Sequence, residues 1–138
     1  MDPDHEKALF QAFVAPRKRQ RYIELLNSTA GREKILRSLD HFKDLDPSFC
    51  HRVKPTEQNL AGVLRLLKSL GAPATCYLVS ANGEWDGREI GLSEALTAVI
   101  GGGWGTFVSC VPGVLAYFEG EEPAERYICH RKDGTAKN

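Results

Sequence analysis

The segment Leu92–Phe118, LSEALTAVIGGGWGTFVSCVPGVLAYF, constrains the fold of this chain more than any other. It begins with apolar residues at helical spacing. A glycine run that contains Trp104 follows them. Two apolar, strand-like runs come next, and they meet at Pro112-Gly113, a dipeptide typical of a turn. The segment therefore predicts a helix, a flexible glycine stop and two adjacent antiparallel strands on which the rest of the chain packs.

The region after Pro73 supplies the other strands. Short runs rich in β-branched and aromatic residues alternate there with turn dipeptides, as in antiparallel sheets. The elements expected are a strand over 74–80, a loop over 81–91 with a short strand at 88–90, a helix over 92–100 capped by Ser93, and strands over 105–111, 114–119 and 125–131.

The region up to Pro73 has its apolar residues at helical spacing. We expect four helices there: one from Asp2-Pro3 to Pro16, one after Pro16, one ending near Asp44–Pro47, and one that Thr56 caps and Gly71 ends. Residues 47–55 are expected to form a linker. The predicted fold is of the α+β class, with this N-terminal four-helix segment packed on a C-terminal β-α-β-β-β, mostly antiparallel four-stranded sheet that helix 92–100 crosses.

A chain of 138 residues is the size of one domain. We expect a single α+β domain with a helical half (1–73), a sheet-forming half (74–131) and a frayed tail (132–138). The total charge is zero, but residues 1–73 carry +4 and residues 74–138 carry −4. This asymmetry favours docking of the halves, or one basic and one acidic face, and is too small to indicate nucleic acid by itself.

The composition is that of a soluble globular protein, with 42% hydrophobic and 26% charged residues. No apolar run approaches the roughly 20 residues that span a bilayer. The acidic N-terminus, MDPDHEKALF, is unlike a secretory signal. We therefore expect a cytoplasmic protein that has no membrane partner, and whose four cysteines are reduced and buried.

The glycine run Gly101–Gly105 resembles a phosphate-binding loop only superficially. A phosphate cradle places its glycines before the N-terminus of a helix, where the amide donors and the helix dipole meet the anion. Here the glycines follow a helix and lead into a strand. We expect a helix stop, and we expect no cofactor.

Two Cys-His pairs, Cys50-His51 and Cys129-His130, raise the question of a zinc site. Structural zinc ligands are usually two to five residues apart, and neighbouring residues on a strand face opposite ways. We therefore expect no bound metal, and a buried thiol beside a surface imidazole in each pair.

A cysteine nucleophile is a further alternative. Cys110 and His130 would form a thiol–imidazole pair if their strands lay close together, with Glu119 or Asp86 orienting the ring. No local signature supports this arrangement, and Cys110 lies inside an apolar run. A small cysteine-dependent hydrolase or transferase is therefore an alternative function; an enzyme is less expected than a non-enzyme.

A basic cluster begins the second helix. Its members are Arg17, Lys18, Arg19 and Arg21, and Arg32 and Arg37 would extend it. Such a face can meet phosphates, and two basic helices joined by a short turn suggest a helix-turn-helix. Acidic residues dilute the cluster, so nucleic-acid binding is the second alternative, and a solvated helix face is the simpler interpretation.

The loop over 82–90 is the most informative surface. Trp85, Asp86, Arg88 and Glu89 place an aromatic ring among both signs of charge, and Trp104 would join them at the same end of the sheet. Tryptophan and arginine are enriched at binding hot spots, although Trp85 would also serve to cap the core. The leading hypothesis is a non-catalytic protein-binding or regulatory module. It would contact an unknown protein, or itself, through this loop or an open sheet edge.

Overall fold

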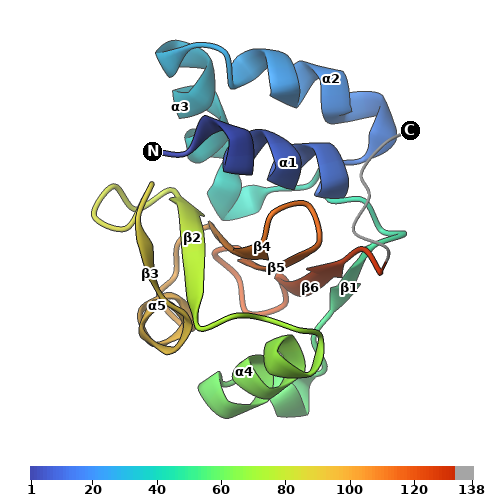
Figure 1. Cartoon of the computed structure of the whole chain (residues 1–138), viewed down its shortest axis with the longest axis vertical. Coiled ribbons are helices and arrows are strands. Elements are labelled where there is room, and N and C mark those ends of the chain that lie inside the picture. The colour runs from blue at the N-terminus through green and yellow to red at the C-terminus, as the bar shows by residue number, and fades with distance from the viewer. Residues whose placement is uncertain (133–138) are drawn as a thin grey trace.

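The computed structural model describes residues 1–132, and it shows an antiparallel sheet with helices on both faces (Figure 1). The α-helices are α1 (Pro3–Phe13), α2 (Pro16–Leu25), α3 (Thr29–Ser38), α4 (Leu60–Ser69) and α5 (Leu92–Val99), and the 3-10 turns are η1 (Leu39–His41) and η2 (Pro55–Glu57). The strands are β1 (Cys50–Arg52), β2 (Thr75–Ser80), β3 (Glu89–Gly91), β4 (Thr106–Val111), β5 (Leu115–Glu119) and β6 (Arg126–His130).

The sheet has the strand order β1-β6-β5-β4-β2-β3, and every neighbouring pair is antiparallel. The predicted α+β class is confirmed, as are the four α-helices that precede the main strands. The sheet is larger than the predicted four strands: β3, expected as a short strand within the loop, joins it at one edge, and β1, which was not expected, joins it at the other.

The sheet separates two hydrophobic cores. Along β2, Tyr77 and Val79 face one core while Cys76 and Leu78 face the other, as the alternation of a strand requires. The first core contains residues of α1, α2 and α3, and the second contains residues of α4 and α5. Both faces of the central strands are therefore dry.

The single N-terminal helical layer predicted from the sequence is wrong for α4. This helix lies with α5 on the face opposite α1–α3, and Val63 and Leu67 are buried there. Figure 1 shows α1–α3 on one side of the sheet and α4 and α5 on the other. The physical reason is that a sheet apolar on both faces needs helices on both.

Residues 47–55 are not only a linker. They contain β1, whose Cys50, His51 and Arg52 pair with Cys129, Ile128 and Tyr127 of β6. A strand of three residues is too short to show an alternation pattern, and its partner is far away in the sequence.

Two expected helix caps are also wrong. The N-cap of α4 is Asn59, whose Oδ1 accepts a hydrogen bond from the Gly62 amide at 2.8 Å, while Thr56 lies in η2. The N-cap of α5 is Gly91, which has no side chain to cap with, so Ser93 already lies inside the helix.

The glycine predictions hold. Gly71 ends α4 with a φ of 101°, and Gly101 and Gly103 follow α5 with φ values of 78° and 86°. These left-handed conformations favour glycine and let the chain reverse into β4. The frayed tail predicted for 132–138 lies outside the described residues, apart from Lys132.

Candidate functional site

An apolar groove of about 260 Å³ lies against the edge strand β1. Its apolar wall comes from Leu66 of α4, the C-cap residue Leu70, Ile128 of β6 and Val53. Its polar lining is His51, Arg52, Lys54, Glu57 and His130. Leu70 is 38% exposed, which is high for a leucine. We call these nine residues the β1 groove.

The backbone of β1 is open on the side away from β6. Hydrogen bonds from the His130 amide to the Phe49 carbonyl and from the Val53 amide to the Arg126 carbonyl, both 2.9 Å, fix the phase of the ladder. Arg52 falls between them at a non-hydrogen-bonding position, so its N–H and C=O point outward. Within residues 1–132 these two groups have no hydrogen-bond partner.

The β1 groove is positively charged. Arg52 and Lys54 are exposed, and His51 and His130 add imidazoles. Glu57 is the one carboxylate in the lining, and Arg65 lies 3.7 Å from it. The groove therefore combines an apolar wall, an open strand edge and a net positive charge.

The predicted Trp85–Glu89 surface is held down at its centre. Asp86 accepts hydrogen bonds from Arg32 at 2.7 and 2.9 Å and from the Ser80 amide at 3.0 Å. Trp85 is half-buried against the core beneath α4 and α5, and the Arg88 guanidinium lies 4.8 Å from its ring centroid. Of the four predicted residues, Arg88 and Glu89 are exposed.

Trp104 lies at the same end of the sheet as that loop, because Ser80 at the end of β2 pairs with Thr106 at the start of β4. Its ring covers Gly102, where an added Cβ would lie 2.8 Å from the ring. No ring-to-ring contact joins Trp85 and Trp104 within residues 1–132. The two tryptophans share an end of the sheet without forming one aromatic surface.

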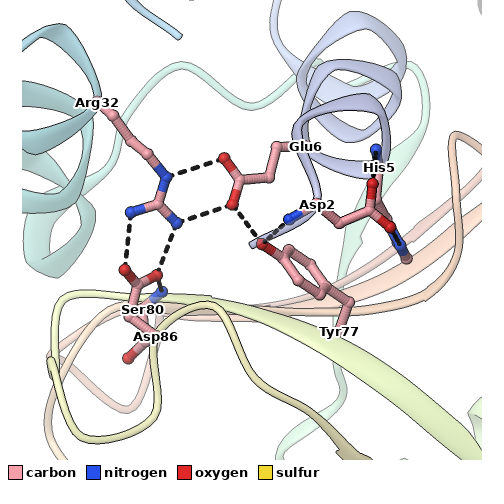
Figure 2. Close-up of polar contacts among 7 residues, drawn as sticks. All are labelled: Asp2, His5, Glu6, Arg32, Tyr77, Ser80 and Asp86. Carbon is pink, nitrogen blue, oxygen red and sulfur yellow. Dashed lines mark hydrogen bonds and ion pairs between the residues drawn. The ribbon is translucent and has the colours of Figure 1, made fainter. Parts of the chain in front are cut away.

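A buried ionic network joins three distant segments (Figure 2). Arg32 of α3 donates from Nε and Nη2 to the two carboxylate oxygens of Glu6 of α1, at 2.9 and 2.8 Å, and it also binds Asp86. Tyr77 of β2 donates its hydroxyl proton to Glu6 at 2.6 Å and accepts from the Asp2 amide at 3.0 Å. Every nitrogen of the guanidinium is engaged, so the network holds α1, α3 and the loop after β2 together.

The network also shifts proton equilibria. The hydrogen bond with Glu6 raises the pKa of Arg32, against the opposing effect of burial, and Asp86 adds to the rise. Burial raises the pKa of Tyr77, and its hydrogen bond to Glu6 adds to the shift. Arg32 therefore stays charged and Tyr77 stays protonated as a donor over the physiological range of pH.

The basic cluster of α2 is smaller than expected. Arg17, Lys18 and Arg21 are exposed, but Arg19 donates to the Val14 carbonyl at 3.0 Å and pairs with Asp46 at 3.2 Å. Arg32 does not extend the cluster, because it is buried in the ionic network. Three exposed cations on one helix remain.

A serine, a histidine and an aspartate come together near the start of α1, which the sequence did not indicate. His5 Nε2 lies 2.6 Å from Ser109 Oγ, and His5 Nδ1 lies 4.0 Å from Asp2. The spatial arrangement Ser109–His5–Asp2 resembles a nucleophilic triad, but Ser109 is fully buried in β4 and lines none of the three main cavities. A nucleophile must reach its substrate, so this arrangement serves packing rather than catalysis.

His5 makes the stability of the fold depend on pH. Burial lowers the pKa of His5 below its usual value of 6.5, against the raising effects of Asp2, Glu89 and Glu6. As the pH falls through about 6.5, His5 becomes protonated in the unfolded chain before it does so in the folded chain. The free energy of unfolding should therefore fall as the pH drops below about 6.5. Urea unfolding of the wild type at pH 8, 7, 6 and 5 measures this loss.

The matching variant is His5→Gln, which keeps a hydrogen-bonding group beside Ser109 but cannot titrate. We expect it to show a flatter dependence between pH 7 and pH 5 than the wild type. His51→Gln, at an exposed histidine of β1, should keep the wild-type slope. Equal slopes in His5→Gln and the wild type would contradict the assignment.

The cysteine nucleophile receives no geometric support. Cys110 of β4 and His130 of β6 are separated by β5, which puts about 10 Å between their strands. Burial raises the pKa of the Cys110 thiol to about 12, so almost none of it is thiolate at neutral pH. Glu119 accepts from the Tyr117 hydroxyl at 2.6 Å and the Gly101 amide at 2.8 Å, so it is not free to orient an imidazole.

The two Cys-His pairs have the alternation expected of strands. Cys50 and Cys129 are buried in the core beneath α1–α3, whereas His51 and His130 line the β1 groove on the other face. Within the described part of the chain, no three histidine, cysteine or acidic side chains gather closely enough to hold a metal ion.

Among residues 1–132 no helix has the length and apolarity to cross a bilayer. A scan against protein-family models found no match, and neither did the searches of curated proteins and of solved structures.

Proposed function

We propose that this chain is a non-catalytic protein-binding module, and that the β1 groove is its docking surface. The observation that carries the proposal is the open backbone of Arg52 beside an apolar, positively charged groove. The occupant that fits is an extended segment of a partner protein that carries acidic residues next to an apolar one.

Docking would extend the sheet by one strand. The outward N–H and C=O of Arg52 offer one donor and one acceptor to an incoming backbone, as in other strand-addition complexes. An apolar side chain of the segment would pack on Leu66, Leu70 and Ile128. Acidic side chains on either side of it would meet Arg52 and Lys54, which favours acidic segments over basic ones.

The opposite edge is the weaker choice. Strand β3 (Glu89–Gly91) is as short as β1, but α5 begins immediately after it at Leu92. Its outward-facing residues include Glu89, and none of the three main cavities is lined by a residue of this strand. The β3 edge therefore offers no apolar groove beside its open backbone, which the β1 edge does.

The other candidate surfaces are less complete. The Trp85–Glu89 loop is half-buried, and Asp86 is already bound to Arg32. Nucleic-acid binding would depend on Arg17, Lys18 and Arg21 of α2 and on Arg37 of α3, which is few cations for an affinity dominated by phosphate contacts.

The proposal predicts that Leu70→Asp weakens binding at least about tenfold, because one buried leucine contributes about 1.5–3 kcal/mol and the added carboxylate repels an acidic segment. The probe is a fluorescent peptide of alternating glutamate and valine, followed by anisotropy at fixed ionic strength. The matched control is Leu60→Asp, at the first residue of α4, whose C-cap is Leu70; Leu60 is 39% exposed and lies outside the groove.

A second variant tests the backbone directly. Arg52→Pro removes the outward amide without removing a ladder hydrogen bond, so it should reduce binding while β1 stays paired. A peptide in which lysine replaces glutamate should bind more weakly than the acidic one. Equal binding by Leu70→Asp and Leu60→Asp would refute the β1 groove as the docking surface.

A second copy of this chain, bound through the same edge, is the competing occupant of the groove. Light scattering decides between the two occupants. If the wild type has twice the 15.3 kDa chain mass and Arg52→Pro is a monomer, the occupant is a second copy and not a partner segment. A monomeric wild type that binds the acidic peptide would support the proposal as stated.

A further inference from the structure

Cys50 of β1 and Cys129 of β6 lie directly opposite each other in the sheet. They form a non-hydrogen-bonding pair of the ladder. The His130 amide, one residue after Cys129, donates to the carbonyl of Phe49, one residue before Cys50, and the Val53 amide donates to the Arg126 carbonyl in the same phase. Residues in such pairs have Cα atoms about 4.5 Å apart, which is inside the range of about 4.4–6.8 Å that a disulfide spans. Both side chains point to the same face of the sheet, into the core beneath α1–α3.

The sulfur atoms interact in the reduced protein. Burial raises the pKa of Cys129 well above its usual value, and a hydrogen bond and charge interaction with Cys50 add to the rise. The Cys50 thiol also donates weakly to the Phe13 carbonyl at 3.8 Å. The two thiols therefore lie close enough to affect each other's proton equilibrium, as their opposed positions in the ladder require.

One of the two thiols borders open space. Cys50 lines a cavity of about 170 Å³, whose other lining residues are Phe42, Lys43, Leu45, Pro47 and Tyr127. Cys129 is completely buried and does not line it. Lys43 is exposed and would attract an anionic small molecule toward Cys50.

We propose that Cys50 and Cys129 form a reversible disulfide that fastens the edge strand β1 to β6, with Cys50 as the attacking thiol and Cys129 as the resolving one. The oxidant is a small disulfide such as oxidised glutathione. The Cys50 thiolate attacks one of its sulfurs, forms a mixed disulfide and releases one glutathione thiolate. The Cys129 thiolate then attacks Cys50 Sγ and releases the second, so that two protein thiols lose two electrons and two protons and two glutathione thiols form.

The bond would act on the β1 groove, and this part of the inference rests on the proposed function. Residues adjacent to the two cysteines, His51 on β1 and Ile128 and His130 on β6, line the groove on the opposite face of the sheet. Three residue pairs hold β1 in place, so a covalent link between its first residue and β6 would limit fraying of the strand. Oxidation should then make the groove more preorganised and increase its affinity for the acidic peptide.

Cys76 and Cys110 provide an internal comparison. They continue the β2–β4 ladder beyond the Tyr77–Ser109 pair and both face the core beneath α4 and α5. Neither thiol lines any of the three main cavities, whereas Cys50 lines one. The inference therefore assigns exchange to the Cys50 pair and not to this one.

The test is incubation of the folded chain with oxidised glutathione, followed by alkylation and intact mass measurement. The expected product has lost about 2 Da and two of four alkylatable thiols, and a peptide map links residue 50 to residue 129. Cys129→Ala should stop at a glutathione adduct on Cys50, about 305 Da heavier. Cys50→Ala should give neither product, and the Cys76→Ala/Cys110→Ala double variant should still oxidise.

The oxidised protein should also melt at a Tm roughly 10 °C higher than the reduced one, because the bond closes a long loop in the unfolded chain. Four unchanged thiols after incubation, or a link between residues 76 and 110, would overturn the inference. These readouts need no ligand. Disulfide formation without a change in peptide affinity would refute only the effect on the groove, and peptide binding without disulfide formation would leave the docking proposal intact.

Discussion

Replacing Arg32 by methionine should lower the free energy of unfolding by about 3–5 kcal/mol, as expected when one partner of a buried ion pair is removed. The methionine fills similar space but leaves the carboxylates of Glu6 and Asp86 without their shared cation. Glu6 is 2% exposed, so water does not replace the lost hydrogen bonds. Urea unfolding at pH 7.5 measures the change.

The matched control is Arg37→Met, the same substitution on the same helix at an exposed position, which should change stability by less than about 0.5 kcal/mol. Adding Glu6→Gln to Arg32→Met should recover part of the loss, because it removes one of the two unpaired charges. Arg32→Met and Arg37→Met variants of equal stability would show that the network contributes nothing to the fold.

Replacing Gly105 by alanine should destabilise the protein by at least about 3 kcal/mol, or prevent folding, because the added methyl group has no space. A Cβ at this position would lie 2.1 Å from the carbonyl carbon and oxygen of Leu39 and 2.6 Å from the Asp40 amide nitrogen. These are backbone atoms, so no side-chain rotation relieves the clash. The Gly105 amide also donates to Asp40 Oδ1 at 2.7 Å, a bond that the displacement would break.

Gly83→Ala is the control for that substitution. No atom lies within 4 Å of a Cβ at Gly83, and its φ is outside the left-handed region. Its thermal unfolding should match that of the wild type or shift slightly upward, because alanine reduces the entropy of the unfolded chain. A Tm for Gly105→Ala within 2–3 °C of the wild type would mean that η1 can move away from β4 at little cost.

Elements with a local signal could be predicted from the sequence. Gly71 and Pro73 ended α4 correctly, and Pro112-Gly113 marked the turn between β4 and β5, where Gly113 has a φ of 72°. These features depend on the conformational preferences of one or two residues, which the sequence shows directly. The strands from β2 to β6 were recognisable for a related reason, because turn residues bound short apolar runs.

The placement of α4 and β1 depends on contacts that no local pattern reveals. The amphipathic face of α4 shows that the helix is buried on one side, but not which face of the sheet it covers. One signal was present: β4, TFVSCV, is apolar on both faces, and a strand of that kind needs cover on both. The sequence held no comparable signal for β1.

The candidate site divides in the same way. Buried Cys129 beside His130 followed from strand alternation, but β1 was not predicted, and the groove itself is formed by segments from three parts of the chain. The ionic network is similarly dispersed, since Glu6, Arg32 and Asp86 are far apart in the sequence. Neither arrangement has a spacing that a sequence pattern can detect.

The pairing of β1 with β6 also determines when the proposed docking surface is complete. Cys50 and Cys129 are 79 residues apart, and ribosomes add about 5–20 residues per second. The β1 segment therefore leaves the ribosome several seconds before β6, its strand neighbour in the described sheet, is synthesised. During that interval α1–α3 are complete but β1 has no sheet to join, so a partner segment could not be captured by a nascent chain. Binding of a partner segment at the proposed groove would begin only after β6 has been synthesised, so it would be a post-translational event.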